Sequence, residues 1–227
     1  MSQWDFAVNF FIALFALIDP IGNVPLFAAA TTGADPRGRR LVAFYISLLV
    51  LGFLTFFYFT GLSLLAFFGI SLPAFRIAGG VILFLLGLEM AREDFTARFA
   101  AAAEGETDAR SWARRRFAGL IVPFGMPLLI GPGAISTVII YASEARQFGL
   151  TGTAIGLAAI AAISVLVLAA FAASHVVGRV LGKIGTSIVV RVLGLILCAM
   201  AVQFIMVGIA DSTEGVIRAE AAAPYEH

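Results

Sequence analysis

The chain has 227 residues, of which 61% are hydrophobic and only 13% are charged. Soluble domains are about 45–50% apolar and about 25% charged, so this composition excludes an ordinary water-soluble fold and leaves lipid as the solvent for most of the chain. The formal net charge is +1 and no long stretch is strongly basic, which gives no reason to expect nucleic acid as a partner.

Six long apolar segments are predicted to cross the bilayer as helices. A helix needs about 20 mostly apolar residues to span the hydrocarbon, and these segments lack the alternating pattern of barrel strands. Backbone amides in hydrocarbon must be paired within their own segment, so all six are expected to be helical. The expected fold is therefore all-α, a polytopic protein with one membrane domain over residues 1–227. The predicted spans are residues 6–30, 41–68, 72–90, 117–143, 148–174 and 189–210.

The basic residues predict the orientation. The first, third and fifth loops between the spans carry three, six and two of the fifteen Lys and Arg residues. Because cytoplasmic loops are enriched in basic residues, these loops are expected in the cytoplasm and both termini outside. The third loop, residues 91–116, is expected to be a solvated linker, whose arginines at its end are an orientation signal or meet anionic membrane lipids. Residues 211–227 are expected to be a polar tail. No basic residue precedes Arg37, so we expect the first span to be retained rather than removed as a signal peptide.

The two halves of the chain, residues 6–90 and 117–210, resemble each other. A shift of 112 to 115 residues places Pro20 on Pro132 and Arg76 on Arg191. Each half contains three predicted spans. Since three is odd, the halves must cross the membrane in opposite senses, which predicts the inverted-topology repeat found in many secondary transporters.

Proline and glycine interrupt the first and fourth spans. Residues 19–25 include two prolines, a glycine, a carboxylate and an amide, and residues 123–133 include three prolines and three glycines. A proline inside a helix removes a hydrogen-bond donor and costs about 3 kcal/mol, so neither span is expected to be one continuous helix. Each break lies about 20 Å along its span, from opposite faces of the membrane, and we expect the two breaks to meet near the midplane.

These breaks predict a polar binding site. The second half of a broken helix begins with unpaired amides that suit an anionic group, and the first half ends in carbonyls that suit an ammonium group or a cation. Asp19 is the strongest candidate and the expected ion-coupling residue, since a carboxylate within a span costs about 2.5–3.5 kcal/mol to insert. The predicted substrate-binding residues are Asp19, Gly22, Asn23, Gly131, Gly133, Ser136 and Thr137.

Structural explanations compete with such a site. The prolines could simply kink closely packed helices, and Asp19 or Asn23 could cap the second half-helix. The two repeat-related arginines could snorkel to the headgroups or act as gates, and Glu89 could pair with Arg92 at the interface. We predict no metal site and no cofactor. A gating or structural role is predicted for Pro20, Pro25, Arg76, Glu89, Pro132 and Arg191, and close helix contact for Gly79, Gly80, Gly87 and Gly194.

Several segments together resemble the MarC family of UPF0056-type membrane proteins. They are residues 19–27, 76–80 with 83–84 and 88–90, and 127–137, and the resemblance extends from residue 6 to residue 208. It implies an inner (plasma) membrane protein with six spans, similar to LysE-type transporters, and some members are similar to transporters of small neutral amino acids. Many members have Asn where this chain has Asp19, so the coupling ion and the charge of the substrate stay open.

The sequence is typical of a secondary transporter and not of an enzyme. An intramembrane protease would need a serine and a histidine at one depth, whereas Ser136 lies mid-span and His175 lies at a surface. A redox enzyme would need paired cysteines, and only Cys198 is present. The expected activity is alternating-access transport of small neutral amino acids or similar zwitterions, coupled to H⁺ or Na⁺. A pore or a non-transporting membrane scaffold is the alternative, and a homo-oligomer is left open.

Overall fold

The computed structural model describes residues 2–92, 109–120 and 129–213, and within these ranges every regular element is a helix. The predicted all-helical fold is confirmed for this part of the chain. The helices are α1 (Gln3–Ile18), α2 (Val24–Ala30), α3 (Pro36–Phe67), α4 (Leu72–Arg92), α6 (Ala109–Leu120), α7 (Pro132–Ala145), the short 3-10 helix η3 (Arg146–Phe148), α8 (Gly149–Ala172) and α9 (Ser174–Ser212).

Four helical stretches among the described residues are long and apolar enough to cross a membrane. They are Pro36–Phe67, Leu72–Arg92, Pro132–Val176 and Ile184–Ser212, and α1 is a shorter apolar helix. The protein is thus an integral membrane protein with several apolar helices, as the composition predicts. By helix length, four stretches qualify rather than the six predicted spans. The predicted first and fourth spans are each divided between two shorter helices, and none of these is long enough to qualify by itself.

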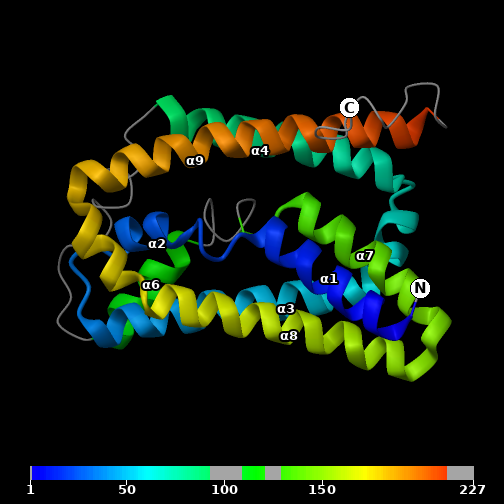
Figure 1. Ribbon diagram of the computed structural model, residues 1–227, viewed down its shortest axis with the longest axis horizontal. Coiled ribbons are helices and arrows are strands. Elements are labelled where there is room, and N and C mark those ends of the chain that lie inside the picture. Colours follow the sequence, from blue (N-terminus) through cyan, green and yellow to red (C-terminus); the bar gives the residue numbers. More distant parts are fainter. Residues whose placement is uncertain (1, 93–108, 121–128, 214–227) are drawn as a thin grey trace.

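The long helices form two pairs on either side of shorter ones (Figure 1). α4 packs along α9 on one side and α3 packs along α8 on the other, while α1, α2 and α7 lie between the pairs. α6 packs against α3. The interrupted helices therefore occupy the middle of the molecule, and the long helices that flank them carry much of the lipid-facing surface.

Small residues bring α4 and α9 close together. A side chain on Gly80 would collide with the carbonyl of Ala201, and one on Gly87 would collide with the carbonyl of Gly194. The two helices are antiparallel, since the contact moves back along α9 as it moves forward along α4. Close backbone packing stabilises helix pairs in lipid, where the hydrophobic effect does not drive helices together. The prediction of close contact at these glycines is confirmed.

A buried hydrogen bond joins α3 to α8. The hydroxyl of Ser47 donates to the carbonyl of Ser164 at 2.5 Å. Farther along α3, the ring of Tyr58 packs where Gly156 has no side chain. This pair is also antiparallel, so both outer layers are built from helices that run in opposite senses.

α1 turns one face toward the interior. Phe6, Phe10, Leu14 and Ile18 recur every four residues and are fully buried, whereas Ile12 on the opposite face is 56% exposed. This spacing matches the 3.6-residue period of a helix with one packed face. α1 is therefore held by packing although its 16 residues are too few to span the bilayer.

The chain departs from the predicted boundaries in three places. Arg116, expected at the end of a solvated linker, is 3% exposed because α6 carries it into the packed interior. α9 begins at Ser174, well before the predicted sixth span, and is broken only at Gly182, which has a φ of 60°. Asp211, expected in the polar tail, belongs to α9.

The rest of the predicted linker, residues 93–108, and residues 214–227 lie outside the described residues, as do residues 121–128 of the predicted fourth span.

Candidate functional site

α1 ends at Asp19, as the prolines and glycine of residues 19–25 predict. Asp19 has a φ of 42° and ψ of 64°, the left-handed conformation of a helix end, and its amide still donates to the carbonyl of Phe15 at 2.9 Å. The following Pro20 disfavours a helical conformation at Asp19 and has no amide proton with which to continue the ladder. The chain then turns over residues 20–23 before α2 begins at Val24.

The carboxylate of Asp19 folds back over this turn. Its Oδ1 accepts a hydrogen bond from the amide of Gly22 at 2.9 Å. A side chain on Gly22 would collide with the same carboxylate, so glycine is needed for this arrangement. Among the described residues, no hydrogen bond reaches the second oxygen, Oδ2, and Asp19 is half-buried. One oxygen thus stabilises the turn, and the other retains its capacity to accept.

The side chain of Asn23 forms hydrogen bonds to the end of α1 and not to the start of α2. Its side-chain amide donates to the carbonyl of Ile18 at 3.0 Å and to that of Asp19 at 3.1 Å. These are carbonyls that a helix end leaves without an intrahelical donor. Asn23 is 8% exposed and precedes α2, but its side chain makes no capping hydrogen bond to that helix. Its carboxamide therefore compensates for the break, and the alternative that Asn23 caps the second half-helix is wrong.

The second predicted break ends at the start of α7. Gly131 is the N-cap with extended backbone, and Pro132 is the first helical residue. The ring of Pro132 fills the space that Gly79 of α4 leaves without a side chain, and Gly133 faces the ring of Phe204 of α9. The beginning of α7 is therefore in close contact with both helices of the α4 and α9 pair.

The two predicted hydroxyl ligands differ in how they are used. Ser136 is 1% exposed and donates its hydroxyl to the carbonyl of Pro132 within its own helix. Thr137, the next residue of α7, is half-buried. The serine hydroxyl has committed its one proton to this carbonyl, so it could only accept a hydrogen bond from a solute.

Packing brings the end of α1 and the start of α7 to one level. The rings of Phe10 and Tyr141 stack at 4.6 Å between centroids. From this stack, nine residues lead forward along α1 to Asp19 and nine lead back along α7 to Pro132, so both helix ends lie about 14 Å from it. α1 packs against α7, and Figure 1 shows the two helix ends near the middle of the long axis. A carbonyl end with a carboxylate thus lies at the same level as the amide end of another helix.

The sequence profile of the MarC family, described as MarC family integral membrane protein, matches residues 4–213. The chain belongs to the MarC family. The match extends over both interruptions and the four helices that pack around them, so the resemblance noted from the three motif segments is confirmed. No solved structure matches the chain.

Curated MarC-type relatives are similar over most of their length. A UPF0056 membrane protein of Aquifex aeolicus is 33% identical, covering 89% of this chain and 91% of its own. A UPF0056 membrane protein of Pyrococcus abyssi is 35% identical over 88% and 92% of the two chains, and YhcE of Escherichia coli is 31% identical over 94% and 97%. Their names state a membrane protein and no activity.

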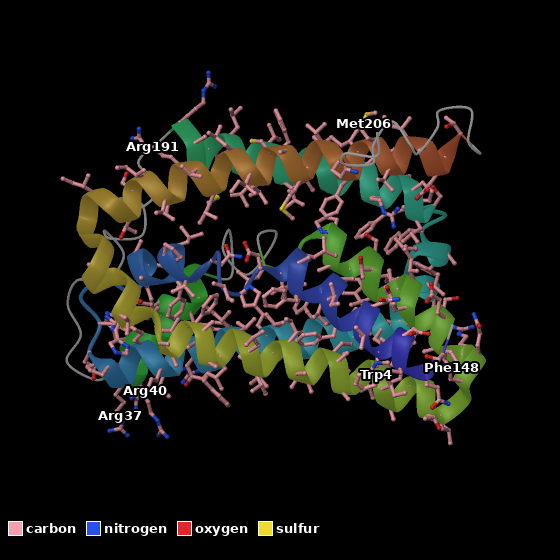
Figure 2. The ribbon with its side chains drawn as sticks, in the orientation of Figure 1. Trp4, Arg37, Arg40, Phe148, Arg191 and Met206 are labelled. Atoms are coloured by element: carbon pink, nitrogen blue, oxygen red, sulfur yellow. The ribbon has the colours of Figure 1, made fainter. Side chains whose placement is uncertain are left out.

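The remaining predicted polar residues of this MarC family chain lie away from the two helix ends. Arg76 at the start of α4 forms an ion pair with Asp211 near the end of α9, at 2.6 Å. Arg191 and Glu89 are exposed, and Figure 2 shows Arg191 on the outer side of α9. The sequence analysis missed Asp211 because it treated that residue as tail. The predicted inverted repeat offered a signal, since such a repeat would make the third and sixth spans antiparallel and bring the start of one to the end of the other.

Proposed function

We propose that this MarC family protein is a secondary transporter that moves small neutral amino acids or similar zwitterionic solutes by alternating access. Asp19 and the carbonyl end of α1 would receive the ammonium group or a coupling H⁺ or Na⁺. The amide end of α7, at Gly131 and Gly133, would receive the carboxylate. The observation that carries the proposal is that these two oppositely polarised helix ends lie at one level between two pairs of long helices. No cofactor or enzymatic step is part of it.

The pattern of helix contacts supports an inverted repeat behind this mechanism. A two-fold exchange of α1 with α6, α2 with α7, α3 with α8 and α4 with α9 turns most of the major contacts into another one. The α1 and α8 contact becomes the α6 and α3 contact, and the α2 and α9 contact becomes the α7 and α4 contact. The α3 and α8 pair and the α4 and α9 pair map onto themselves.

Equivalent positions also touch where a two-fold axis would pass. Ser47 and Ser164, which are 117 residues apart, are hydrogen-bonded. The thiol of Cys198 lies 3.6 Å from the carbonyl of Phe84, 114 residues earlier. These separations are close to the shift of 112 to 115 residues that aligns the two halves of the sequence. They support two repeats of three crossings each, six crossings in all, of which the first and fourth are broken.

Flux measured in proteoliposomes tests the proposal. We expect radiolabelled alanine, glycine or serine to show saturable uptake that increases when a pH or sodium gradient is imposed and that is absent from protein-free liposomes. Flux that rises linearly with solute concentration would indicate a pore. Absence of flux for all three solutes under both gradients would indicate a scaffold, and either result would overturn the transporter.

The Asp19→Asn variant tests the proposed ion-coupling residue. Asparagine keeps the oxygen that accepts from Gly22 but removes the charge, so we expect the fold to persist while gradient-driven uptake falls at least tenfold. Asp35→Asn is a matched control, because Asp35 accepts from the amide of Gly38 at 2.8 Å in the same relationship at the start of α3. We expect Asp35→Asn to transport normally. Unchanged uptake kinetics in Asp19→Asn would show that Asp19 stabilises its turn and does not couple an ion.

A reporter fused to the C-terminus tests the proposed orientation in the inner membrane. Figure 2 shows Arg37, Arg40 and Arg191 toward one end of the long axis and Trp4 and Phe148 toward the other. Because basic residues favour the cytoplasmic side, we expect the end with Trp4 and both termini to face outward. A C-terminal alkaline phosphatase fusion should therefore be active and a C-terminal green fluorescent protein fusion dark. The reverse pair of results would contradict this orientation.

A further inference from the structure

A buried cation lies at the end of α2, away from the break. Arg116 of α6 is 3% exposed, and its Nε donates to the carbonyl of Ala30 at 2.5 Å. This carbonyl belongs to the last turn of α2, which lacks intrahelical donors. One further nitrogen of the guanidinium, Nη2, is buried and has no hydrogen-bond partner among the residues that the structure describes. A buried charge with an unpaired donor is unfavourable, which indicates that a partner is missing.

A second buried donor without a partner belongs to the same region. Ser174, the first residue of α9, is fully buried, and its hydroxyl makes no hydrogen bond. Buried polar groups in native proteins are nearly always paired, so each exception calls for an explanation. Among the described residues, the buried side-chain atoms without a partner are Arg39 Nε, Tyr58 Oη, Arg116 Nη2 and Ser174 Oγ.

Helix register places Ser174 at the level of Ala30. The rings of Phe27 on α2 and Phe171 on α8 stack at 4.5 Å between centroids with only 11° between their planes. The two helices run in the same direction there (Figure 1), and α2 packs against both α8 and α9. Ala30 and Ser174 each follow their stacked ring by three residues, about 4.5 Å farther along. Arg116, bound to the carbonyl of Ala30, therefore lies at the level of the Ser174 hydroxyl.

We propose that Arg116 and Ser174 form a binding site for a small oxyanion of the carboxylate or phosphate class. Arginine offers donors only, in a planar arrangement that matches such anions, and the serine hydroxyl supplies a further donor. The bond from Nε to Ala30 fixes the guanidinium and leaves Nη2 for the ligand. Since both side chains are almost completely buried, the occupant is a small free anion rather than a lipid headgroup. The site is separate from the Asp19 turn and does not depend on transport.

Thermal unfolding of the purified full-length protein in a neutral detergent tests this site. Sodium acetate and sodium phosphate would be compared with sodium chloride at equal ionic strength, and tryptophan fluorescence would report Tm. Because a ligand that binds only the folded state stabilises it, we expect one of the two oxyanions to raise Tm by about 2 to 4 °C over chloride. Equal Tm values in acetate, phosphate and chloride would overturn the proposal, as would a rise seen only with phosphatidylglycerol.

Two variants and a control locate the effect. We expect Arg116→Gln to abolish the oxyanion-dependent rise and Ser174→Ala to reduce it by at least half. Arg114→Gln, which changes an exposed arginine of the same helix, should keep the full rise. If Arg116 has only a structural role, Arg116→Gln would lower Tm equally in all salts and retain the oxyanion-dependent rise, which would refute the site. Should Arg116→Gln fail to fold, a full rise in Ser174→Ala would refute it. The thermal-unfolding assay does not depend on solute flux. The oxyanion site and the transporter can therefore be refuted separately.

Discussion

The two ends of the long axis are held together by different chemistry. At the aromatic end, defined by Phe6, Phe10, Tyr141 and Phe148, α1 packs on α7 and η3 through rings whose centroids lie 4.6 to 5.8 Å apart. At the arginine end, defined by Arg116 and the carbonyl of Ala30, α6 is joined to α2 by a buried hydrogen bond. Under the proposed repeat, the contact of α1 with α7 is equivalent to the contact of α6 with α2. Two equivalent helix contacts are thus formed by ring packing at one end and by a hydrogen bond at the other.

The difference matters for the proposed transporter, whose two ends would open in turn. Ring packing is non-directional, and lipid or solute carbon can replace part of it when the helices separate. The buried guanidinium is directional, and every donor that loses its acceptor must find water or an anion. In the proposed cycle, opening of the arginine end would therefore be coupled to hydration or ligand binding, whereas opening of the aromatic end would be governed by how well the rings pack.

Truncation of a ring should have the largest effect. Phe10→Ala removes a fully buried side chain that packs on Tyr141, and we expect it to lower the free energy of unfolding by about 3 kcal/mol. This is the lower end of the range for Phe→Ala in water-soluble cores, because lipid supplies little hydrophobic drive between helices. Ile12→Ala, on the exposed face of the same helix, is the control and should change stability by less than about 0.5 kcal/mol. Equal losses in a denaturant titration of the two variants would show that the aromatic end is not a packed contact.

Loss of the arginine should come next. Arg116→Met removes the donor to Ala30 and leaves that carbonyl buried, which we expect to cost about 1 to 2 kcal/mol in the same titration. Removal of the buried charge offsets part of the loss, since a buried cation is itself costly to desolvate. Arg114→Met provides the exposed control on α6. A loss larger than that of Phe10→Ala would reverse the comparison and make the hydrogen bond the stronger closure.

Much of this architecture was predictable from local sequence. Composition and apolar runs identified a helical membrane protein, and the prolines around residue 20 placed the end of α1 at Asp19. Pro132 likewise marked the start of α7. These features follow from backbone chemistry within a few residues, because a proline alters the hydrogen bonds of its own helix. The inverted arrangement stays a prediction, which follows from a repeat with an odd number of spans.

Local sequence did not predict the positions of residues that are fixed by tertiary contacts. Arg116 stood beside two other arginines in a polar stretch, which indicated a solvated linker, yet α6 carries it into the interior. The amide of Asn23 suited a helix start, whereas its acceptors are carbonyls of the preceding helix. Asp211 followed the last apolar run and was assigned to the tail. In each case the partner lies on a segment whose position the local pattern does not encode.

The ion pair between Arg76 and Asp211 should have the smallest effect, and it tests whether packing alone holds the aromatic end. It joins α4 to α9 at that end of the long axis (Figure 1), but Asp211 is 47% exposed. Exposed pairs contribute about 0.2 to 1 kcal/mol, and salt screens them. A double-mutant cycle of Arg76→Gln and Asp211→Asn should therefore give a coupling energy in that range that declines in 1 M sodium chloride. A coupling above about 1.5 kcal/mol that resists salt would mean that the pair is shielded from water. The aromatic end would then also depend on a directional polar contact, and the contrast with the arginine end would be one of position rather than of chemistry.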